Sequence, residues 1–323
     1  MNGALRTNLL LALAVAFAAA LSVASGKVSL PWSAWTFDDP RWLIIAELRF
    51  PRMVLALVVG AALGLSGAAM QGYLRNPLAD PGLFGISSGA ALGATLSLYF
   101  GYTSSPFILP AFALAGAAAS MFALTLLAGR SGSLILFALA GMILASITTS
   151  LTSLTISLAS TPLGASQIVL WLMGALTDRS WDDVRITLPV VLVGAVMLAF
   201  TARSLDALTL GEQAARSMGV DQSRLQWLIV LGVGLCVGAS VAASGMIGFV
   251  GLMVPHLVRP LVGGKPSAIL LPSALGGALL VLVADSLVRI APTVSEVRLG
   301  IAMSMLGGPF FLVMLLRLRR SLA

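Results

Sequence analysis

Charged side chains are the scarcest class in this sequence. Only 10% of its 323 residues are Asp, Glu, Lys or Arg, and 59% are hydrophobic, whereas a soluble domain carries about 25% charged residues. So much apolar sequence cannot be hidden in one soluble core, which indicates a polytopic membrane protein in a lipid bilayer. The net charge of +7 is best explained by lysine and arginine held on the cytoplasmic side, and no nucleic-acid partner is expected.

Cysteine is almost absent as well. Cys236 is the only one, which excludes an internal disulfide and is typical of a small packing residue. A Walker A loop is also missing, because the nearest match, Gly263-Gly264-Lys265, is followed by Pro266 where Ser or Thr is required. We therefore expect ATP and Mg to bind a separate ATPase chain, and this chain to bind no cofactor or metal of its own.

The sequence also lacks recognisable catalytic motifs, so no catalytic residue is assigned. The single histidine, His256, is expected to be a hydrogen-bonded structural residue. An intramembrane protease would need paired aspartates, a metal motif or a Ser–His arrangement. Asp285 is the only acid placed well within an expected span, and Arg289 one turn later predicts an ion pair. A proton- or sodium-coupled carrier would keep ionisable residues near the midplane. Both alternatives stay open, but a non-enzymatic transport subunit is favoured.

Long apolar runs predict an all-α protein with ten membrane-spanning helices in a single domain, residues 1–323. Residues 166–176 are too short to cross and predict a half-helix, and the span near Pro255 and Pro260 should be short and broken. A secretory signal peptide is the alternative for the first 26 residues. The expected spans are about 8–24, 51–73, 83–100, 107–128, 134–159, 186–202, 225–244, 249–262, 268–290 and 299–316.

Ten crossings place both chain termini on one side of the membrane, and the distribution of charge selects the cytoplasm. In this topology the inside segments hold 11 of the 19 basic residues and 4 of the 12 acidic ones. The inside therefore carries +7 and the outside zero, as the positive-inside rule requires.

The most distinctive stretch runs from Arg49 to Gly93. An Arg-Phe-Pro-Arg start precedes an apolar helix in which Gly60 and Gly64 are spaced for the close approach of another helix. This helix ends in Met-Gln, and the polar break Asn-Pro-Leu-Ala-Asp-Pro-Gly follows at residues 76–82. The combination closely resembles the FecCD family, the permease subunits of ATP-driven ABC importers, and the resemblance extends from residue 8 to residue 320.

This resemblance implies a type II ABC importer permease fold in a bacterial inner membrane. It implies a homodimer of this chain, two ATP-binding subunits on the cytoplasmic side and a periplasmic substrate-binding protein on the other side. The substrate would be an iron-siderophore, haem or cobalamin, moved from periplasm to cytoplasm. Iron chelates are favoured only because they are the commonest substrates in the family.

The longest polar segment assigned to the inside, residues 203–224, predicts a short helix outside the membrane. Thr209 and Glu212 have the spacing of a capping box, and Gly219 stands where a left-handed residue would end the helix. An ordinary interfacial loop fits the spacing equally well. The resemblance implies that this helix docks in a cleft of the ATPase subunit through a motif composed of Gly211, Glu212, Ala214, Ala215 and Gly219.

A tight turn and a serine stripe are assigned to the transport pathway. Pro77 forbids a continuous helix, and the resemblance implies that Asn76 and Leu78 beside it narrow the cytoplasmic exit. The fifth span carries hydroxyls on one helical face, and three threonines form a neighbouring stripe. These hydroxyls could instead bond to backbone carbonyls or pack helices. Pathway lining is favoured, because this span faces the dimer axis in the family, and is assigned to Ser146, Ser150, Ser153 and Ser157.

Three arginines, Arg49, Arg52 and Arg289, are expected to be exposed at the outer ends of their spans. Plain interfacial anchoring is one interpretation, since tryptophans at 32, 35 and 42 lie nearby as belt residues. The resemblance implies a second role, in which these arginines receive a glutamate from each lobe of the binding protein. The planar guanidinium suits such a contact because it binds carboxylates through two parallel hydrogen bonds.

Overall fold

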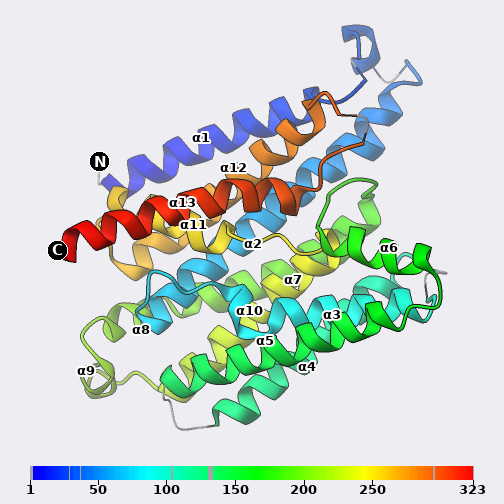
Figure 1. Cartoon of the computed structure of the whole chain (residues 1–323). Helices are drawn as coiled ribbons and strands as arrows, with labels where there is room; N and C mark the ends of the chain where they lie inside the picture. The colour runs from blue at the N-terminus through cyan, green and yellow to red at the C-terminus, as the bar shows by residue number, and fades with distance from the viewer. Residues whose placement is uncertain are drawn as a thin grey trace.

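The computed structural model describes residues 3–28, 30–36, 38–102, 105–129, 134–293 and 295–322. Its regular elements in these ranges are all helical, with no strand among them. Figure 1 shows the long helices running side by side along one common direction. Both chain termini, α8 and α9 lie at one end of this bundle, the termini end, and α6 lies toward the opposite, far end.

The helices differ widely in length. The long ones are α1 (Gly3–Ala24), α2 (Phe50–Leu74), α4 (Ile108–Ala128), α5 (Leu134–Ser157), α7 (Trp181–Phe200), α10 (Gln222–Ser244), α12 (Pro266–Ile290) and α13 (Leu299–Leu322). The short ones are α3 (Ile86–Tyr99), α6 (Pro162–Leu172), α8 (Ala202–Leu208), α9 (Glu212–Ser217) and α11 (Val250–Val258). A π-helical turn, Ile44–Arg49, leads into α2, and 3₁₀ turns lie at Trp32–Trp35, Pro81–Phe84 and Arg259–Leu261.

Seven of the described helices are long and apolar enough to cross a membrane: α1, α2 with its preceding turn, α4, α5, α7, α10 and α12. The other three expected spans are helical but shorter. Helix α3 has 14 residues, and the apolar parts of the other two are Val250–Leu261, which is α11 with the turn after it, and Leu299–Met314 in α13. An all-helical, multi-span chain is therefore confirmed, whereas ten crossings remain a prediction.

Helix α2 is the centre of the bundle and packs against α12, α10, α11 and α7. Its contact with α12 depends on two glycines, because a Cβ at Gly60 or Gly64 would collide with the backbone carbonyls of Gly277 or Ser273. The predicted close approach is confirmed. Without side chains at these positions the two backbones come together, which is how helices associate in lipid.

Several helix starts differ from the predicted bounds, and side-chain caps explain two of them. Helix α7 begins five residues earlier than expected because Ser180 and Asp183 form a reciprocal capping box. Helix α6 covers 162–172 instead of the predicted 166–176, since the Thr161 hydroxyl accepts the Gly164 N–H at its start. Its C-terminal end is followed by Gly174 in a left-handed conformation, which turns the chain away.

The lone cysteine and the lone histidine have packing roles. Cys236 is a free, fully buried residue on α10, so the predicted packing role is confirmed. His256 on α11 packs edge-on against Phe310, with ring centroids 5.9 Å apart. Its Nδ1 is buried without a hydrogen-bond partner in the described structure, so the expectation of a hydrogen-bonded histidine is wrong for that atom.

Candidate functional site

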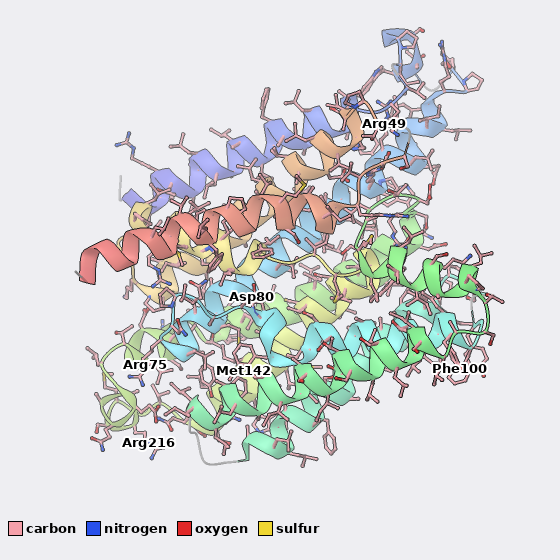
Figure 2. All side chains as sticks on the ribbon, viewed as in Figure 1. Arg49, Arg75, Asp80, Phe100, Met142 and Arg216 are labelled. Carbon is pink, nitrogen blue, oxygen red and sulfur yellow. The ribbon has the colours of Figure 1, made fainter. Side chains whose placement is uncertain are left out.

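Five charged side chains meet at the far end of the bundle, where Figure 2 labels Arg49. We call them the arginine cluster: Arg49, Arg52, Asp285, Arg289 and Glu296. Arg52 donates from Nε and Nη2 to Asp285 at 2.8–3.1 Å and from Nη2 to Glu296 at 2.9 Å. Arg289 Nη2 lies 3.1 Å from Asp285 Oδ2. The predicted Asp285–Arg289 ion pair is confirmed, and Arg52 joins it.

The three arginines are buried, not exposed as expected. Their exposed fractions are 7% for Arg49, 9% for Arg52 and 4% for Arg289. Arg52 is covered by its two carboxylate partners. Arg49 and Arg289 are covered by the C-terminal end of α1, which packs against α12 and leaves backbone carbonyls without helical partners. Arg49 donates to the carbonyls of Val23, Ala24 and Val28 at 2.7–3.0 Å. The expectation of exposed guanidinium groups is therefore wrong, while their role in docking remains a prediction.

The arginine cluster is not neutral. Three guanidinium groups face two carboxylates, which leaves one positive charge. Among the described residues, the hydrogen bonds of Arg49 go to backbone carbonyls. Partial burial would raise the pKa of the Glu296 carboxyl, but hydrogen bonding and charge from Arg52, with a further hydrogen bond from Thr177, lower that pKa below its usual range. Glu296 is thus held as a carboxylate between the α6–α7 link and α2.

A cavity of about 340 Å³ lies where the polar break after α2 meets the start of α11. Asp80 lines this cavity, so the break returns to the protein before α3 begins; Figure 2 labels the residue. Asp80 Oδ1 accepts the Gly82 N–H at 2.6 Å. Hydroxyls and backbone dominate the polar lining, which includes Ser87, Ser88, Thr149, Ser240, Ser244 and residues 245–249.

The predicted serine stripe lies on an open face of α5. All four serines are exposed in this chain, whereas Thr148, Thr152 and Thr155 are buried and donate to carbonyls one turn back at 2.8–2.9 Å. The backbone-bonding alternative therefore holds for the threonines and also for Ser153, whose hydroxyl donates to the Thr149 carbonyl at 3.0 Å. Thr149, between the two stripes, lines the cavity, so the serine-bearing face and the cavity adjoin. Pathway lining by the serines remains a prediction.

The Asn-Pro-Leu turn follows directly after α2, and the break predicted at Pro77 is confirmed. Arg75 ends the helix in a left-handed conformation with φ of 50°. Asn76 Oδ1 then accepts the Leu78 N–H at 2.9 Å, which fixes the turn in the manner expected of an asparagine before proline. Asn76 and Pro77 are exposed, and no contact of this chain tests whether they form a gate.

The polar segment between α7 and α10 contains two helices, not one. Thr209 ends α8, where its hydroxyl donates to the Asp206 carbonyl at 2.7 Å, so the predicted capping box with Glu212 is wrong. Gly211, at φ of 100°, makes the sharp turn into α9. The left-handed cap is confirmed: Gly219 has φ of 84°, and the Val220 N–H bonds to the Ala215 carbonyl at 3.0 Å.

Two interactions of the candidate sites were not predicted. Glu296 enters the arginine cluster from the α12–α13 link, and Arg75 Nη2 lies 3.6 Å from Glu212 Oε1 on α9. Both join residues far apart in the chain. The only available signal was composition, since Arg75 and Glu296 each follow a long apolar stretch and Glu212 lies in the polar segment 203–224.

Three comparisons place these features among known proteins. The sequence pattern of the FecCD transport family matches residues 10–317. The hemin transport system permease protein HmuU of Yersinia pestis is 36% identical, with 99% of each chain covered. The Fe(3+) dicitrate transport system permease protein FecD of Escherichia coli K12 is 36% identical, covering 95% of this chain and 97% of the relative.

A solved structure described as an inward-facing conformation of a metal-chelate type ABC transporter also matches. Its TM-score is 0.88 with 32% sequence identity, and the superposition covers 97% of this chain and 99% of the other. The likeness therefore covers the spans, the short α3 and α11 and both ends of the bundle.

Proposed function

This chain belongs to the FecCD transport family, and from that premise we propose that it forms the membrane pathway of an importer for an iron chelate. Members of the family are permease subunits of ABC importers and are not enzymes themselves. Such permeases work with ATPase and substrate-binding subunits in the inner membrane, which they cross several times. The match to HmuU over nearly the full length of both chains carries the proposal.

An iron chelate is the proposed substrate class because two relatives carry hemin and Fe(3+) dicitrate in their names. Cobalamin is the alternative implied by the sequence motifs. A wall of serine hydroxyls beside a cavity with a single carboxylate, Asp80, is consistent with passage of a bulky chelate, since it offers no cluster of strong ligands that would strip the metal.

The proposed assembly has two copies of this chain, two ATPase subunits that hold ATP and Mg, and one periplasmic binding protein. Ten crossings are proposed, with α3, α11 and α13 completing the seven apolar spans. Both termini would be cytoplasmic, which is supported by their location at one end of the bundle (Figure 1). The exposed serine face of α5 would then be available to the second copy or to the pathway.

Three sites are proposed within this assembly. The turn formed by residues 76–78 narrows the cytoplasmic exit of the pathway. Helix α9 and its flanks, with Gly211, Glu212, Ala214, Ala215 and Gly219, contact the ATPase, although Thr209 now belongs to the end of α8. The arginine cluster lies beneath the docking surface of the binding protein, and its excess positive charge attracts the partner's carboxylates.

Reconstitution in liposomes tests the function. The chain, its ATPase subunits and its binding protein would be supplied with hemin, ferric dicitrate, a ferric hydroxamate or cyanocobalamin. We expect one iron chelate to accumulate only with ATP inside and binding protein outside. If only cyanocobalamin accumulates, the proposed substrate class, an iron chelate, is wrong and cobalamin takes its place. Uptake driven by a proton or sodium gradient without ATP would overturn the importer assignment.

Docking has its own test in Arg49→Gln. Among the described residues the Arg49 guanidinium bonds to backbone carbonyls, so this change removes its charge and keeps an amide donor for them. We expect the affinity for the binding protein to fall by up to about fivefold at low salt, because the buried charge would act on the partner's carboxylates through the solvent above the cluster. The difference should shrink at high salt, which screens an attraction that passes through solvent. Arg41→Gln is the control, because Arg41 is an exposed arginine already paired with Asp39. Equal affinity of Arg49→Gln and the unmodified chain at low salt would contradict the role.

A further inference from the structure

An ion pair connects two segments to which the proposed function gives different roles. Arg75 Nη2 lies 3.6 Å from Glu212 Oε1, and both side chains are partly exposed, at 42% and 33%. Arg75 immediately precedes the turn at residues 76–78, and Glu212 is the first residue of α9. Figure 2 labels Arg75 and Arg216 at the same end of the molecule, as this pairing requires.

On one side of the pair, Arg75 is tied tightly to the turn. Its backbone is left-handed, at φ of 50° and ψ of 33°, a conformation that restricts how the chain can continue. The Asn76 N–H reaches back to the Gln71 carbonyl at 3.2 Å, and the Ala79 N–H bonds to the Asn76 carbonyl at 3.1 Å. With the Asn76–Leu78 bond, these contacts make residues 75–79 one short rigid unit, so a displaced Arg75 carries Leu78 with it.

On the other side, Glu212 is tied to α9 as a whole. Helix α9 is braced against the start of α10, where Gln222 Nε2 donates to the Glu212 carbonyl at 3.5 Å and Arg216 donates to Gln222 Oε1 at 2.6 Å. Glu212 is the only acidic residue of α9. A movement of α9 therefore moves the carboxylate that holds Arg75.

We propose that Arg75 is a positioning residue that links the ATPase-contact helix α9 to the exit turn. The ion pair holds the turn in one position and releases it when α9 is displaced. Such a link must break and form repeatedly, and a pair this exposed has the low strength that allows it. A buried, bidentate pair of the kind seen in the arginine cluster would be too costly to open. This inference rests on the proposed roles of α9 and of the turn.

Cross-linking between two copies of the chain tests the link without any substrate. Leu78→Cys is introduced with Cys236→Ser, and the chain is purified with its ATPase subunits. Disulfide formation is compared without nucleotide and with ATP plus vanadate. In the Arg75→Glu and Glu212→Arg backgrounds we expect the nucleotide-dependent difference to shrink by about twofold to fivefold, the range of an exposed ion pair. The double exchange, Arg75→Glu with Glu212→Arg, should restore it.

Matched variants separate the effect of the Arg75 charge from the effect of its backbone conformation and from the general effect of breaking an exposed ion pair. Arg75→Gly relieves the left-handed strain but removes the charge, so it should behave like Arg75→Glu, whereas Arg75→Lys should retain the nucleotide response. Lys265→Glu breaks a comparable exposed pair, Lys265–Asp206 at 3.3 Å, and should leave the response unchanged.

The outcomes distinguish failure of this inference from failure of the function beneath it. If Leu78→Cys forms no cross-link in any state, or one that ignores nucleotide, the proposed exit turn is wrong. If the unmodified pair shows a nucleotide response that both single charge reversals retain, the gate stands and the link is wrong. A response lost in the single variants and not restored by the exchange would also overturn the link, because a salt bridge predicts rescue.

Discussion

The arginine cluster at the far end of the bundle and the ion pairs that join helices at the termini end are held in opposite ways. At the far end, Arg52, Asp285 and Arg289 are each less than 10% exposed and share several hydrogen bonds. At the termini end, Arg75–Glu212 and Lys265–Asp206 are single contacts of 3.6 and 3.3 Å between partly exposed side chains. Removing one partner of a buried pair leaves an uncompensated charge, whereas water compensates an exposed one.

The difference indicates where the molecule is rigid and where it can move. The arginine cluster joins α1, α2, α12 and the link before α13, so separating these elements would break several hydrogen bonds at once. At the termini end the helices are joined by single ion pairs, each of which can break without the other. This asymmetry agrees with the proposed contact of ATPase subunits with α9 at the termini end.

The largest effect should come from Asp285→Ala. Arg52 and Arg289 would then lie buried without their shared carboxylate, which costs about 3–5 kcal/mol. Thermal unfolding of the detergent-solubilised chain should show a large drop in midpoint, and the yield of folded protein should fall. Asp39→Ala, which breaks an exposed pair with Arg41, is the control. An unchanged unfolding midpoint for Asp285→Ala would mean that the buried cluster is no more important for stability than the exposed ion pairs.

An intermediate effect is expected for Glu296→Gln. The amide keeps an acceptor for Arg52 and Thr177 but loses the charge, and Asp285 still compensates Arg52. Loss of one charge-assisted hydrogen bond at a partly buried site costs about 1.5–3 kcal/mol. The unfolding midpoint should lie between those of Asp285→Ala and the unmodified chain. A loss as large as that of Asp285→Ala would mean that the link before α13, and not α12, organises the cluster.

Patterns of spacing predicted much of the fold. The helices, the break at Pro77, the Gly60 and Gly64 contact and the left-handed Gly219 each follow from residues close together in sequence. The span ends at Ser180 and Thr161 were misplaced because a cap depends on one side-chain rotamer, which apolar periodicity does not register.

The candidate sites were predicted less well, because burial and long-range pairing are properties of packing. The sequence places the arginines at 49, 52 and 289 at exposed span ends. The C-terminal end of α1 covers Arg49 and Arg289, and Asp285 and Glu296 pair with Arg52. The pairing of Arg75 with Glu212 spans 137 positions of the sequence, and no local pattern predicts it. The sequence spacing of Thr209 fitted a capping box for the next helix. In the structure Thr209 instead ends α8, and its hydroxyl bonds to the Asp206 carbonyl of that helix.

The smallest effect should come from Lys265→Gln, which breaks the Lys265–Asp206 pair at the termini end. Lys265 is 65% exposed on its side chain, and Asp206 keeps the backbone N–H of Ser267 as a donor at 2.9 Å. Lys265 also stands at the N-terminus of α12, where the helix dipole disfavours a positive charge, so part of the loss is offset. The cost should be about 0–1 kcal/mol and should vanish near 1 M salt, where the Debye length is about 3 Å. The loss of stability caused by Asp285→Ala should persist at about 1 M salt, because buried charges are poorly screened. Unfolding midpoints of both variants at low and high salt provide the measurement. If salt changes the loss of stability of both variants by the same amount, burial does not explain the difference between the arginine cluster and the ion pairs of the termini end.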